Sequence, residues 1–301
     1  MELKDIFFNK ELTTSKNELN KIEKELLDPL AVNLTKCVKW AYLDGLSDSK
    51  SELYPIAVVG EGKPLLLLHG FDSCFLEFRR LTPLLKDKFM LIIPDLFGFG
   101  FCPRPKHTEY GIDSIITHLK KILEVLNINS NVSLVGASMG GGIAIKLARE
   151  IPKTINKLLL LSPAGLTDPP SPIYPPFDLL GACFLKQAFV RKQLCKQAFA
   201  NPKDVSAPEL QIASIHTNMP GWKESLAAFA RKGGISNCGL PLPKQSTKII
   251  WGEEDRILTK SSRDKCIKLL NCSHESIPQC GHLPHIDSPY LVAKYCLEEF
   301  G

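Results

Sequence analysis

The chain has 301 residues, a length that allows one large domain or two modest ones. With 44% hydrophobic and 23% charged residues it has the composition of a globular protein, which excludes a disordered tail or a fibrous repeat. The formal net charge of +5 is small for this length, and no basic cluster interleaved with aromatic residues marks a nucleic-acid partner.

The cysteine pattern bears on the compartment and on metal binding. Ten cysteines are spread from Cys37 to Cys296 without a CxxC pair or metal-ligand spacing. A chain of this length buries enough apolar surface without disulfides, so reduced thiols are favoured. The first residues carry acids and no apolar signal region, and no apolar run approaches the ~20 residues that cross a bilayer. We expect a soluble, cytoplasmic protein without metal or cofactor.

The beginning of the chain predicts a helical extension and lead-in over residues 1–50. Ser15-Lys16-Asn17-Glu18 has the spacing of a capping box at a helix N-terminus. Apolar residues follow at helical intervals, until Pro29 interferes: Leu19, Ile22, Leu26 and Leu30. Such an amphipathic helix packs on its own domain, which is the favoured interpretation, or on a partner or a membrane surface.

From residue 54 onward, short apolar runs alternate with helical segments. The consecutive leucines at 65–68 and 158–161 are typical of strands buried on both faces, as in a parallel sheet. Strands are predicted at 56–59, 64–69, 89–94, 132–135, 158–161, 248–251 and, more weakly, 273–277. Helices are predicted at 75–85, 112–126, 140–149, 260–270 and 289–299. This alternation predicts an α/β fold with a doubly wound, mostly parallel sheet.

One stretch, residues 167–243, has no strand pattern. Two proline pairs, Pro169-Pro170 and Pro175-Pro176, are followed by helical segments. We interpret it as an inserted helical cap on a core of residues 51–166 and 244–301. It holds eight Lys and Arg against five Asp and Glu. The favoured interpretation of this surplus is a face exposed to solvent; the alternative is a surface that binds an anionic headgroup or membrane. Its apolar side chains are expected to form a pocket wall or the cap's own core: Phe177, Leu179, Leu180, Phe184, Leu185, Phe189, Trp222 and Phe229.

The strongest local pattern is Gly136-Ala137-Ser138-Met139-Gly140, between an apolar run and a helical segment. A serine at so sharp a strand-to-helix turn needs neighbours without Cβ atoms, because larger side chains would collide as the chain reverses. The turn lifts the serine Oγ to the carboxyl end of the sheet. We therefore predict Ser138 as a nucleophile, with an idle serine in a glycine-rich turn as the alternative.

A serine hydroxyl needs a neighbouring base to take its proton. His282 lies in a loop punctuated by Gly and Pro after the last predicted strand, which places it at the same edge of the sheet as Ser138. His285, three residues later, competes for the role. The other candidates are expected to be surface or core residues: His107, His118, His216 and His274.

The acid that orients the histidine should follow a strand at the same edge. Three carboxylates stand in Trp251-Gly252-Glu253-Glu254-Asp255, and we choose Asp255 because the first two most simply cover the turn. Asp168 is the alternative. The order Ser138, Asp255, His282 is the one expected for this architecture.

Acyl transfer also needs donors for the developing oxyanion. One predicted donor is the N–H of Met139, which follows the serine. The other is the N–H of Phe71, in the loop after the predicted strand at 64–69. His69 in that loop is expected to brace it by hydrogen bonding.

Together these patterns resemble the α/β-hydrolase superfamily over residues 50–301. The matching elements are His69-Gly70-Phe71, Asp95-Leu96-Phe97-Gly98-Phe99-Gly100, the turn at Ser138, Trp251-Gly252-x-x-Asp255 and Gly281-His282-x-Pro284-His285. Within the superfamily the chain is similar to cap-bearing serine esterases and carbon–carbon bond hydrolases, and its residues 69–81 to uncharacterised cyanobacterial and plastid members. The resemblance implies hydrolysis through an acyl-enzyme, with a lid-like cap over the substrate pocket.

Three positions refine this expectation. Ser138 stands where dehalogenases and epoxide hydrolases of this fold carry an aspartate, which argues against both reactions. Cys102 ends an Asp-x-x-Gly-x-Gly-x-Ser pattern in place of the serine, which puts the polar role of that residue in doubt. Leu283 stands where carbon–carbon hydrolases often have a tryptophan. We therefore predict a serine hydrolase that cleaves a carboxylic ester of a small or medium apolar acyl substrate. The alternatives are a lipid, thioester or carbon–carbon bond hydrolase, and a non-catalytic binding protein on the same scaffold.

Overall fold

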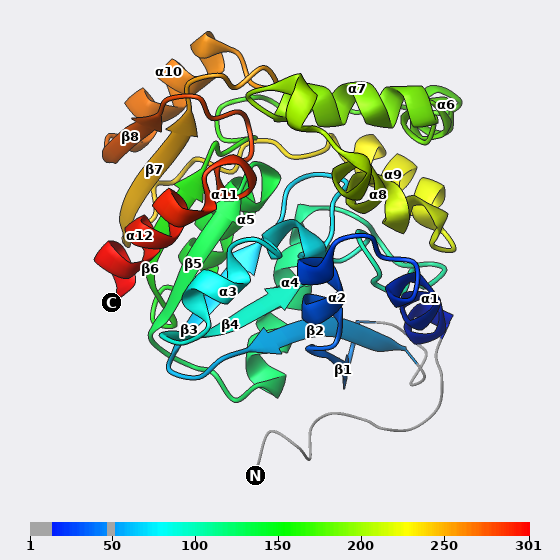
Figure 1. Ribbon diagram of the computed structural model, residues 1–301, viewed down its shortest axis with the longest axis horizontal. Helices are drawn as coiled ribbons and strands as arrows, with labels where there is room; N and C mark the ends of the chain where they lie inside the picture. Colours follow the sequence, from blue (N-terminus) through cyan, green and yellow to red (C-terminus); the bar gives the residue numbers. More distant parts are fainter. Residues whose placement is uncertain (1–13, 47–51) are drawn as a thin grey trace.

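The computed structural model describes residues 14–46 and 52–301, and its centre is an eight-stranded sheet (Figure 1). The strand order is β1-β2-β4-β3-β5-β6-β7-β8. The strands are β1 (Val38–Tyr42), β2 (Leu53–Val59), β3 (Lys63–Leu68), β4 (Phe89–Pro94), β5 (Val132–Ala137), β6 (Ile155–Leu161), β7 (Ser246–Gly252) and β8 (Ser273–Ile277). All neighbours from β4 to β8 are parallel, and β2 is antiparallel to both β1 and β4. The predicted mostly parallel sheet is confirmed.

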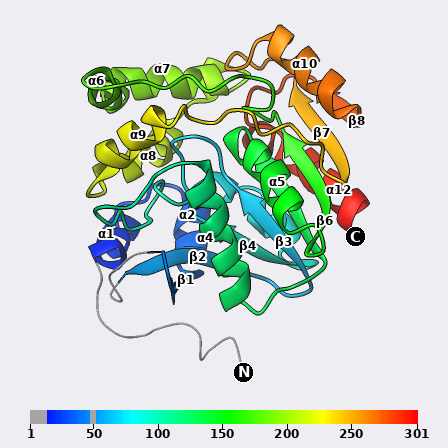
Figure 2. The same ribbon diagram turned by 180° about the vertical axis from the view of Figure 1, so that it is seen from behind.

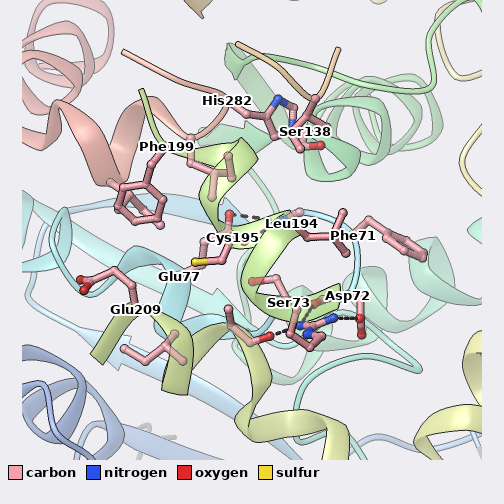
Figure 3. A pocket seen from close by; sticks show the side chains of 18 of the residues that line it. Phe71, Asp72, Ser73, Glu77, Ser138, Leu194, Cys195, Phe199, Glu209 and His282 are labelled. Atoms are coloured by element: carbon pink, nitrogen blue, oxygen red, sulfur yellow. Dashed lines mark hydrogen bonds and ion pairs between the residues drawn. The ribbon is translucent and has the colours of Figure 1, made fainter. Parts of the chain in front are cut away.

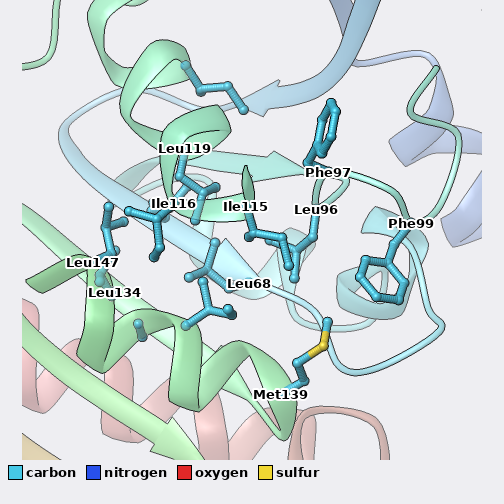
Figure 4. Close-up of a cluster of buried hydrophobic side chains, with 14 of the residues drawn as sticks. Leu68, Leu96, Phe97, Phe99, Ile115, Ile116, Leu119, Leu134, Met139 and Leu147 are labelled. Carbon is cyan, nitrogen blue, oxygen red and sulfur yellow. The ribbon is translucent and has the colours of Figure 1, made fainter. Parts of the chain in front are cut away.

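The leucine runs in β3 and β6 are buried on both faces of this sheet, as predicted. Leu66 and Leu68 contribute to one hydrophobic cluster, while Leu65 and Leu67 contribute to the other. The reason is the period of two in a strand, which sends successive side chains to opposite faces. Each fully buried leucine contributes about 2 kcal/mol from apolar burial. Figure 4 shows the cluster in which Leu68 and Leu134 of the sheet meet Ile116 and Leu119 of the helix α4 (Ile112–Val125).

Helices cover both faces of the sheet. On one face lie α4, α5 (Met139–Glu150) and α10 (Lys260–Leu270), whose buried residues belong to the same cluster as Leu68. On the other lie η2 (Phe75–Phe78), α3 (Thr82–Leu85) and α12 (Pro289–Phe300), preceded by the short α11 (Pro284–Asp287). The prediction of a single helix at 75–85 is wrong, because this segment forms two short helices, η2 and α3. Pro83 lacks an N–H and stands in the first turn of α3, so it begins a new helix instead of continuing the first.

The N-terminal region differs from the prediction. The described part forms α1 (Thr14–Glu23), α2 (Pro29–Thr35) and the edge strand β1, where the sequence predicted a helical lead-in without a strand. Ser15 lies inside α1 and not at its N-cap, and Pro29 begins α2, with the Asp28 side chain accepting the N–H of Leu30 at 2.9 Å. Leu19 is buried in the cluster on the α12 side. The helix α1 thus packs on its own domain; residues 1–13 and 47–51 lie outside the described part.

Between β6 and β7 the chain forms helices. They are α6 (Phe177–Leu185), α7 (Ala188–Ala198), η3 (Pro202–Asp204), α8 (Ala207–Ser214), η4 (Ile215–Asn218) and α9 (Trp222–Arg231). Figures 1 and 2 show α6 to α9 gathered at one end of the molecule, with α6 and α7 on the outside. None of the helices within residues 14–46 and 52–301 combines the length and hydropathy that crossing a bilayer requires.

Candidate active site

Ser138 occupies the turn between β5 and α5. Its backbone, with φ 51° and ψ −117°, lies in a region that L residues rarely adopt, and such strain concentrates at functional sites. Hydrogen bonds hold the turn: the N–H of Ser138 donates to the carbonyl of Leu161 at 2.8 Å, and its own carbonyl accepts the N–H groups of Gly141 and Ala164 at 2.9 Å. The strand–turn–helix arrangement predicted from the sequence is present.

Two glycines of the motif allow this turn for steric reasons. A Cβ at Gly140 would lie 2.1 Å from the carbonyl oxygen of Leu68 in β3. A Cβ at Gly136 would lie 2.4 Å from the carbonyl oxygen of Gly140. Both contacts are with backbone atoms, which cannot swing aside as a flexible side chain can. The glycines therefore let α5 start directly against the ends of β3 and β5.

His282 and Asp255 are hydrogen-bonded to each other. Nδ1 of His282 lies 2.9 Å from Oδ2 of Asp255, across 27 residues of sequence. The carboxylate also accepts the indole N–H of Trp251 at 3.0 Å and the N–H groups of Ile257 and Leu258 at 2.8 and 3.0 Å. Burial alone would raise the pKa of Asp255, but the bond and the charge of His282, together with these N–H donors, bring the pKa below its usual value. An ionised Asp255 holds the hydrogen on Nδ1 and leaves Nε2 of His282 as the acceptor.

Figure 3 shows the His282 ring beside the Ser138 side chain, and both residues line the same cavity. The carboxyl ends of the strands bring these residues together. Ser138 directly follows β5, Asp255 follows β7 and His282 follows β8. The structure therefore brings together all three residues predicted as a catalytic group. Their 144-residue span in the sequence is bridged because they follow β5, β7 and β8, parallel strands that end at the same edge of one sheet.

The competing residues point elsewhere. Nε2 of His285 lies 3.0 Å from Oε1 of Glu77, and the ring stacks on Phe78 with 4.9 Å between centroids. Asp168 is exposed, and its carbonyl accepts the N–H of Asn237. Of the remaining histidines, His107 and His274 are exposed, whereas His118 and His216 are buried.

The loop after β3 lies against the serine. A Cβ at Gly70 would be 3.4 Å from the Cβ of Ser138, and the N–H of Gly70 is taken by the Glu77 carboxylate at 3.2–3.3 Å. Within residues 14–46 and 52–301, no backbone acceptor takes the N–H of the next residue, Phe71. Met139 is the first residue of α5, where an N–H has no partner within the helix. Neither N–H group that was predicted as an oxyanion donor therefore has a backbone acceptor within the described residues.

The predicted bracing role of His69 is confirmed. Its Nδ1 donates to the carbonyl of Gly70 at 2.8 Å, and its Nε2 accepts the N–H of Leu96 at 2.9 Å. Burial lowers the pKa of His69 to about 4, so the ring is neutral near pH 7 and can hold both bonds.

Cys102 keeps a polar contact at the end of the Asp95 motif. The Asp95 carboxylate accepts the N–H groups of Phe75 and Phe101, both at 2.6 Å, and the Cys102 thiol donates to the Asp95 carbonyl with 3.3 Å from Sγ to oxygen. Burial raises the pKa of Asp95 to about 7. These bonds hold the loop after β4, whose Leu96 donates to His69. The Cys102 thiol thus makes a hydrogen bond at the position where the resemblance led us to expect a serine.

Asp72 is a site residue that the sequence analysis missed. It follows Phe71 and has a left-handed backbone, with φ 48°. Its carboxylate accepts the indole N–H of Trp222 at 2.8 Å and the Nε2–H of His216 at 3.1 Å, and it pairs with the guanidinium of Arg191. Burial alone would raise the pKa of Asp72, but His216, Arg191 and Trp222 lower it below its usual value. No local pattern reveals this cluster, because the three donors follow Asp72 by 119 to 150 residues.

The cavity in front of Ser138 has a volume of about 230 Å³ and a mainly apolar wall. Its apolar lining includes Leu185, Leu194, Phe199, Ile212, Leu283 and Ile286. Of the side chains predicted as pocket wall or cap core, only Leu185 lines it. Trp222 and Phe229 are buried in a hydrophobic cluster, whereas five are exposed: Phe177, Leu179, Leu180, Phe184 and Phe189. For these five the prediction is wrong, because helical spacing shows which residues share a face but not which way that face turns.

The two guanidinium groups that border the cavity are already paired. Arg79 pairs with Asp28 of the N-terminal region and with Glu209 of α8, and Arg191 pairs with Asp72. Among the described residues, no group of three His, Cys, Asp or Glu side chains is arranged to hold a metal ion.

Comparison with known proteins agrees with this geometry. A family model described as alpha/beta hydrolase fold matches residues 63–188. The alpha/beta hydrolase domain-containing protein VTE7 of Arabidopsis thaliana is 26% identical over 80% of this chain and 74% of its own length. A 2-hydroxymuconate semialdehyde hydrolase of Pseudomonas sp. is 28% identical over 76% of this chain and 83% of its own, and Lipase 3 of Moraxella sp. is 27% identical over 75% and 74%.

Solved structures show the same fold. The crystal structure of a meta-cleavage product hydrolase, CumD, superposes with a TM-score of 0.73 over 87% of this chain and 97% of its own, at 24% identity. VTE7 is a plant protein, so this match gives only loose support to the expected similarity to cyanobacterial and plastid proteins. The sheet, the turn at Ser138 and these matches show that the chain has the α/β-hydrolase fold, and its residues 63–188 match the family model of that fold.

Proposed function

We propose that this protein is a serine hydrolase that cleaves carboxylic esters of small or medium apolar acyl groups through an acyl-enzyme. The observation that carries the proposal is the 2.9 Å bond between Nδ1 of His282 and Oδ2 of Asp255, at the cavity that Ser138 also lines. That bond leaves Nε2 of His282 free to accept the Ser138 proton.

The reaction would proceed in two displacements. Nε2 of His282 takes the proton as Oγ of Ser138 attacks the ester carbonyl, and the negative charge that develops on the carbonyl oxygen is received by the N–H groups of Phe71 and Met139. The imidazolium then gives its proton to the leaving alkoxide, which leaves an acyl group on Oγ. Water, deprotonated by the same imidazole, attacks the acyl group; the imidazolium then returns the proton to Oγ of Ser138 as the acyl–oxygen bond breaks and the acid is released.

The lining of the cavity supports an uncharged acyl group. Its wall is mostly apolar, and the cations at its border, Arg79 and Arg191, are neutralised by Asp28, Glu209 and Asp72. A substrate carboxylate would have to compete with these buried partners, at a large desolvation cost. We therefore favour ester hydrolysis over carbon–carbon bond cleavage. The relative named 2-hydroxymuconate semialdehyde hydrolase is named after a substrate that carries a carboxylate.

The test is turnover of p-nitrophenyl esters of graded acyl length by purified wild-type, Ser138→Ala and Ser133→Ala proteins. Ser133 lies on the same strand, five residues before the turn, and serves as the matched control. We expect the Ser138 variant to lose turnover and covalent labelling by a fluorophosphonate, while the Ser133 variant keeps both. Full activity of Ser138→Ala would remove Ser138 as the nucleophile.

The same panel separates the other candidates. Thioesters and a 2-hydroxy-6-oxo-dienoate are added as substrates, and a preference for the dienoate would favour carbon–carbon bond hydrolysis. A wild-type protein that neither turns over any of these compounds nor reacts with the fluorophosphonate would favour a non-catalytic binding role.

A further inference from the structure

The helix α6 turns its apolar side toward solvent. Phe177, Leu180 and Phe184 stand at positions i, i+3 and i+7, which form one stripe on a helix, and they are 69%, 59% and 57% exposed. The opposite side carries Asp178 and Ala182, which are buried. Asp178 pairs there with Arg231 of α9. A surface helix normally buries its apolar stripe, so this orientation requires another explanation.

These side chains form one patch with their neighbours in space. We call it the α6–α7 patch; its members, all exposed, are Ile173, Tyr174, Phe177, Leu180, Phe184 and Phe189. The rings of Phe184 in α6 and Phe189 in α7 meet edge to face, with 6.0 Å between their centroids. Figures 1 and 2 show both helices on the outer side of the molecule. Contiguous exposed apolar surface of this kind marks an interaction site.

The exposed charges in the chain segment that carries the patch are positive. From residue 169 to residue 203 the only acid is Asp178, which is buried in its pair with Arg231. Lys186, between α6 and α7, and Lys192, in α7, are exposed. Aromatic side chains flanked by lysines are typical of segments that lie at an anionic membrane surface.

A second copy of the chain fits this patch less well. A two-fold dimer through the same surface would bring Lys186 and Lys192 of both copies to one interface, where like charges repel. Lipid phosphates would neutralise the same lysines, and their long stems would let the ammonium groups reach the phosphates while the rings enter the acyl region.

We propose that the α6–α7 patch docks the protein on the surface of an anionic lipid bilayer. The other side of α7 borders the cavity through Leu194 and Cys195, as does Phe199 directly after the helix, and Leu194 is itself 37% exposed. Docking therefore places one wall of the cavity next to the membrane. If the proposed hydrolase function holds, this position gives lipid-soluble esters a short path to Ser138.

The first experiment measures co-sedimentation of the full-length protein with vesicles of phosphatidylcholine, with and without about one quarter phosphatidylglycerol. We expect the wild type to bind the anionic vesicles more strongly than the neutral ones. Phe177→Gln/Phe184→Gln should bind the anionic vesicles at least ~10-fold more weakly, because two large exposed rings no longer enter the acyl region. Tyr290→Gln, a change at an aromatic residue of α12 that is 77% exposed, is the matched control and should bind as the wild type does.

The second experiment reverses charges. Lys186→Glu/Lys192→Glu should weaken binding to the anionic vesicles by ~10-fold or more, and by less as salt is raised. The control is Lys88→Glu/Lys153→Glu, because Lys88 and Lys153 are exposed just before the parallel strands β4 and β6. They therefore lie at the edge of the sheet opposite to the cap helices, and this double change should leave binding within about twofold.

Two outcomes would overturn the docking proposal. One is a wild type that binds neither kind of vesicle; the other is a Phe177→Gln/Phe184→Gln protein that binds as well as the wild type. A wild-type dimer that this variant converts to a monomer, without vesicle binding, would instead assign the patch to a second copy. Failure of the hydrolase proposal is distinguishable, because Ser138→Ala should still bind vesicles. Conversely, the patch variants should keep wild-type turnover of a water-soluble ester.

Discussion

The indole Nε1 of Trp222 donates a hydrogen bond to Oδ1 of Asp72 at 2.8 Å. Trp222 begins the helix α9, whereas Asp72 belongs to the loop after β3, next to Phe71. Together with Arg191 of α7 and His216 of η4, this bond ties three helical elements to the loop that carries a proposed oxyanion donor. The helices between β6 and β7 therefore fix the geometry of the loop as well as the wall of the cavity.

Replacing Asp72 by asparagine should lower kcat more than it changes KM. Asparagine tolerates the left-handed backbone and keeps one oxygen for Trp222, but it leaves the buried Arg191 guanidinium without a counter-charge. A shifted Phe71 N–H would then stabilise the oxyanion less, and we expect a loss of ~10- to 100-fold in kcat. Steady-state kinetics on a p-nitrophenyl ester measure it.

Asp178→Asn is the matched control for this change. It also breaks an ion pair of the inserted helices, in which Asp178 is buried and Arg231, at the opposite end of α9 from Trp222, is 40% exposed. If both variants lose activity equally, Asp72 acts through general stability and not by positioning that loop.

Asp255→Asn should lower kcat by about 10³–10⁴-fold, because an amide no longer fixes the hydrogen on Nδ1 of His282. Asp168→Asn, at the exposed acid that the sequence left as an alternative, should keep the wild-type rate. Rate measurements on both variants compare the two assignments directly, and the opposite result would exchange the roles of the two acids.

Gly140→Ala should destabilise the fold by ~1–3 kcal/mol or more and reduce turnover. The added methyl group would lie 2.1 Å from the carbonyl oxygen of Leu68, so β3 and α5 must move apart at the serine. Gly181→Ala, in α6, meets nothing within 4 Å and should be neutral or slightly stabilising, since alanine favours the helix. Denaturant unfolding of both variants measures the difference; equal stability would show that the turn tolerates a Cβ.

His118→Leu should flatten the loss of stability in acid. His118 lies beside the rings of Tyr54 and Phe97, and burial lowers its pKa to about 3. Between pH 6.5 and 3 the unfolded chain binds a proton that the folded chain does not, so wild-type stability falls as the pH drops through this range. The leucine variant lacks this contribution, which is on the order of a few kcal/mol.

Chemical unfolding at a series of pH values tests this expectation, with His274→Gln at an exposed histidine as the control. The control should follow the wild-type curve. Identical pH dependence of His118→Leu and the wild type would contradict the assignment of the acid sensitivity to this buried ring.

The sequence predicted those features that depend on neighbouring residues. Consecutive leucines in β3 and β6 indicated strands buried on both faces, and the glycines around Ser138 indicated a turn that only residues without a Cβ allow. The sequence analysis did not treat Pro83 as the start of a new helix, and it missed the short edge strand β1 because only helical structure was predicted over residues 1–50.

The amino-acid sequence by itself thus determined the sheet and the turn at Ser138, because steric limits and strand periodicity act over a few residues. It also proposed His282 and Asp255, which the structure joins by a hydrogen bond. Only the tertiary structure decided which donors meet at Asp72 and which face of α6 is exposed. Trp222 reaches Asp72 across 150 residues, and Phe177 remains exposed because α9 takes the Asp178 side of the helix. Such outcomes depend on how distant elements pack, and no local pattern specifies that packing.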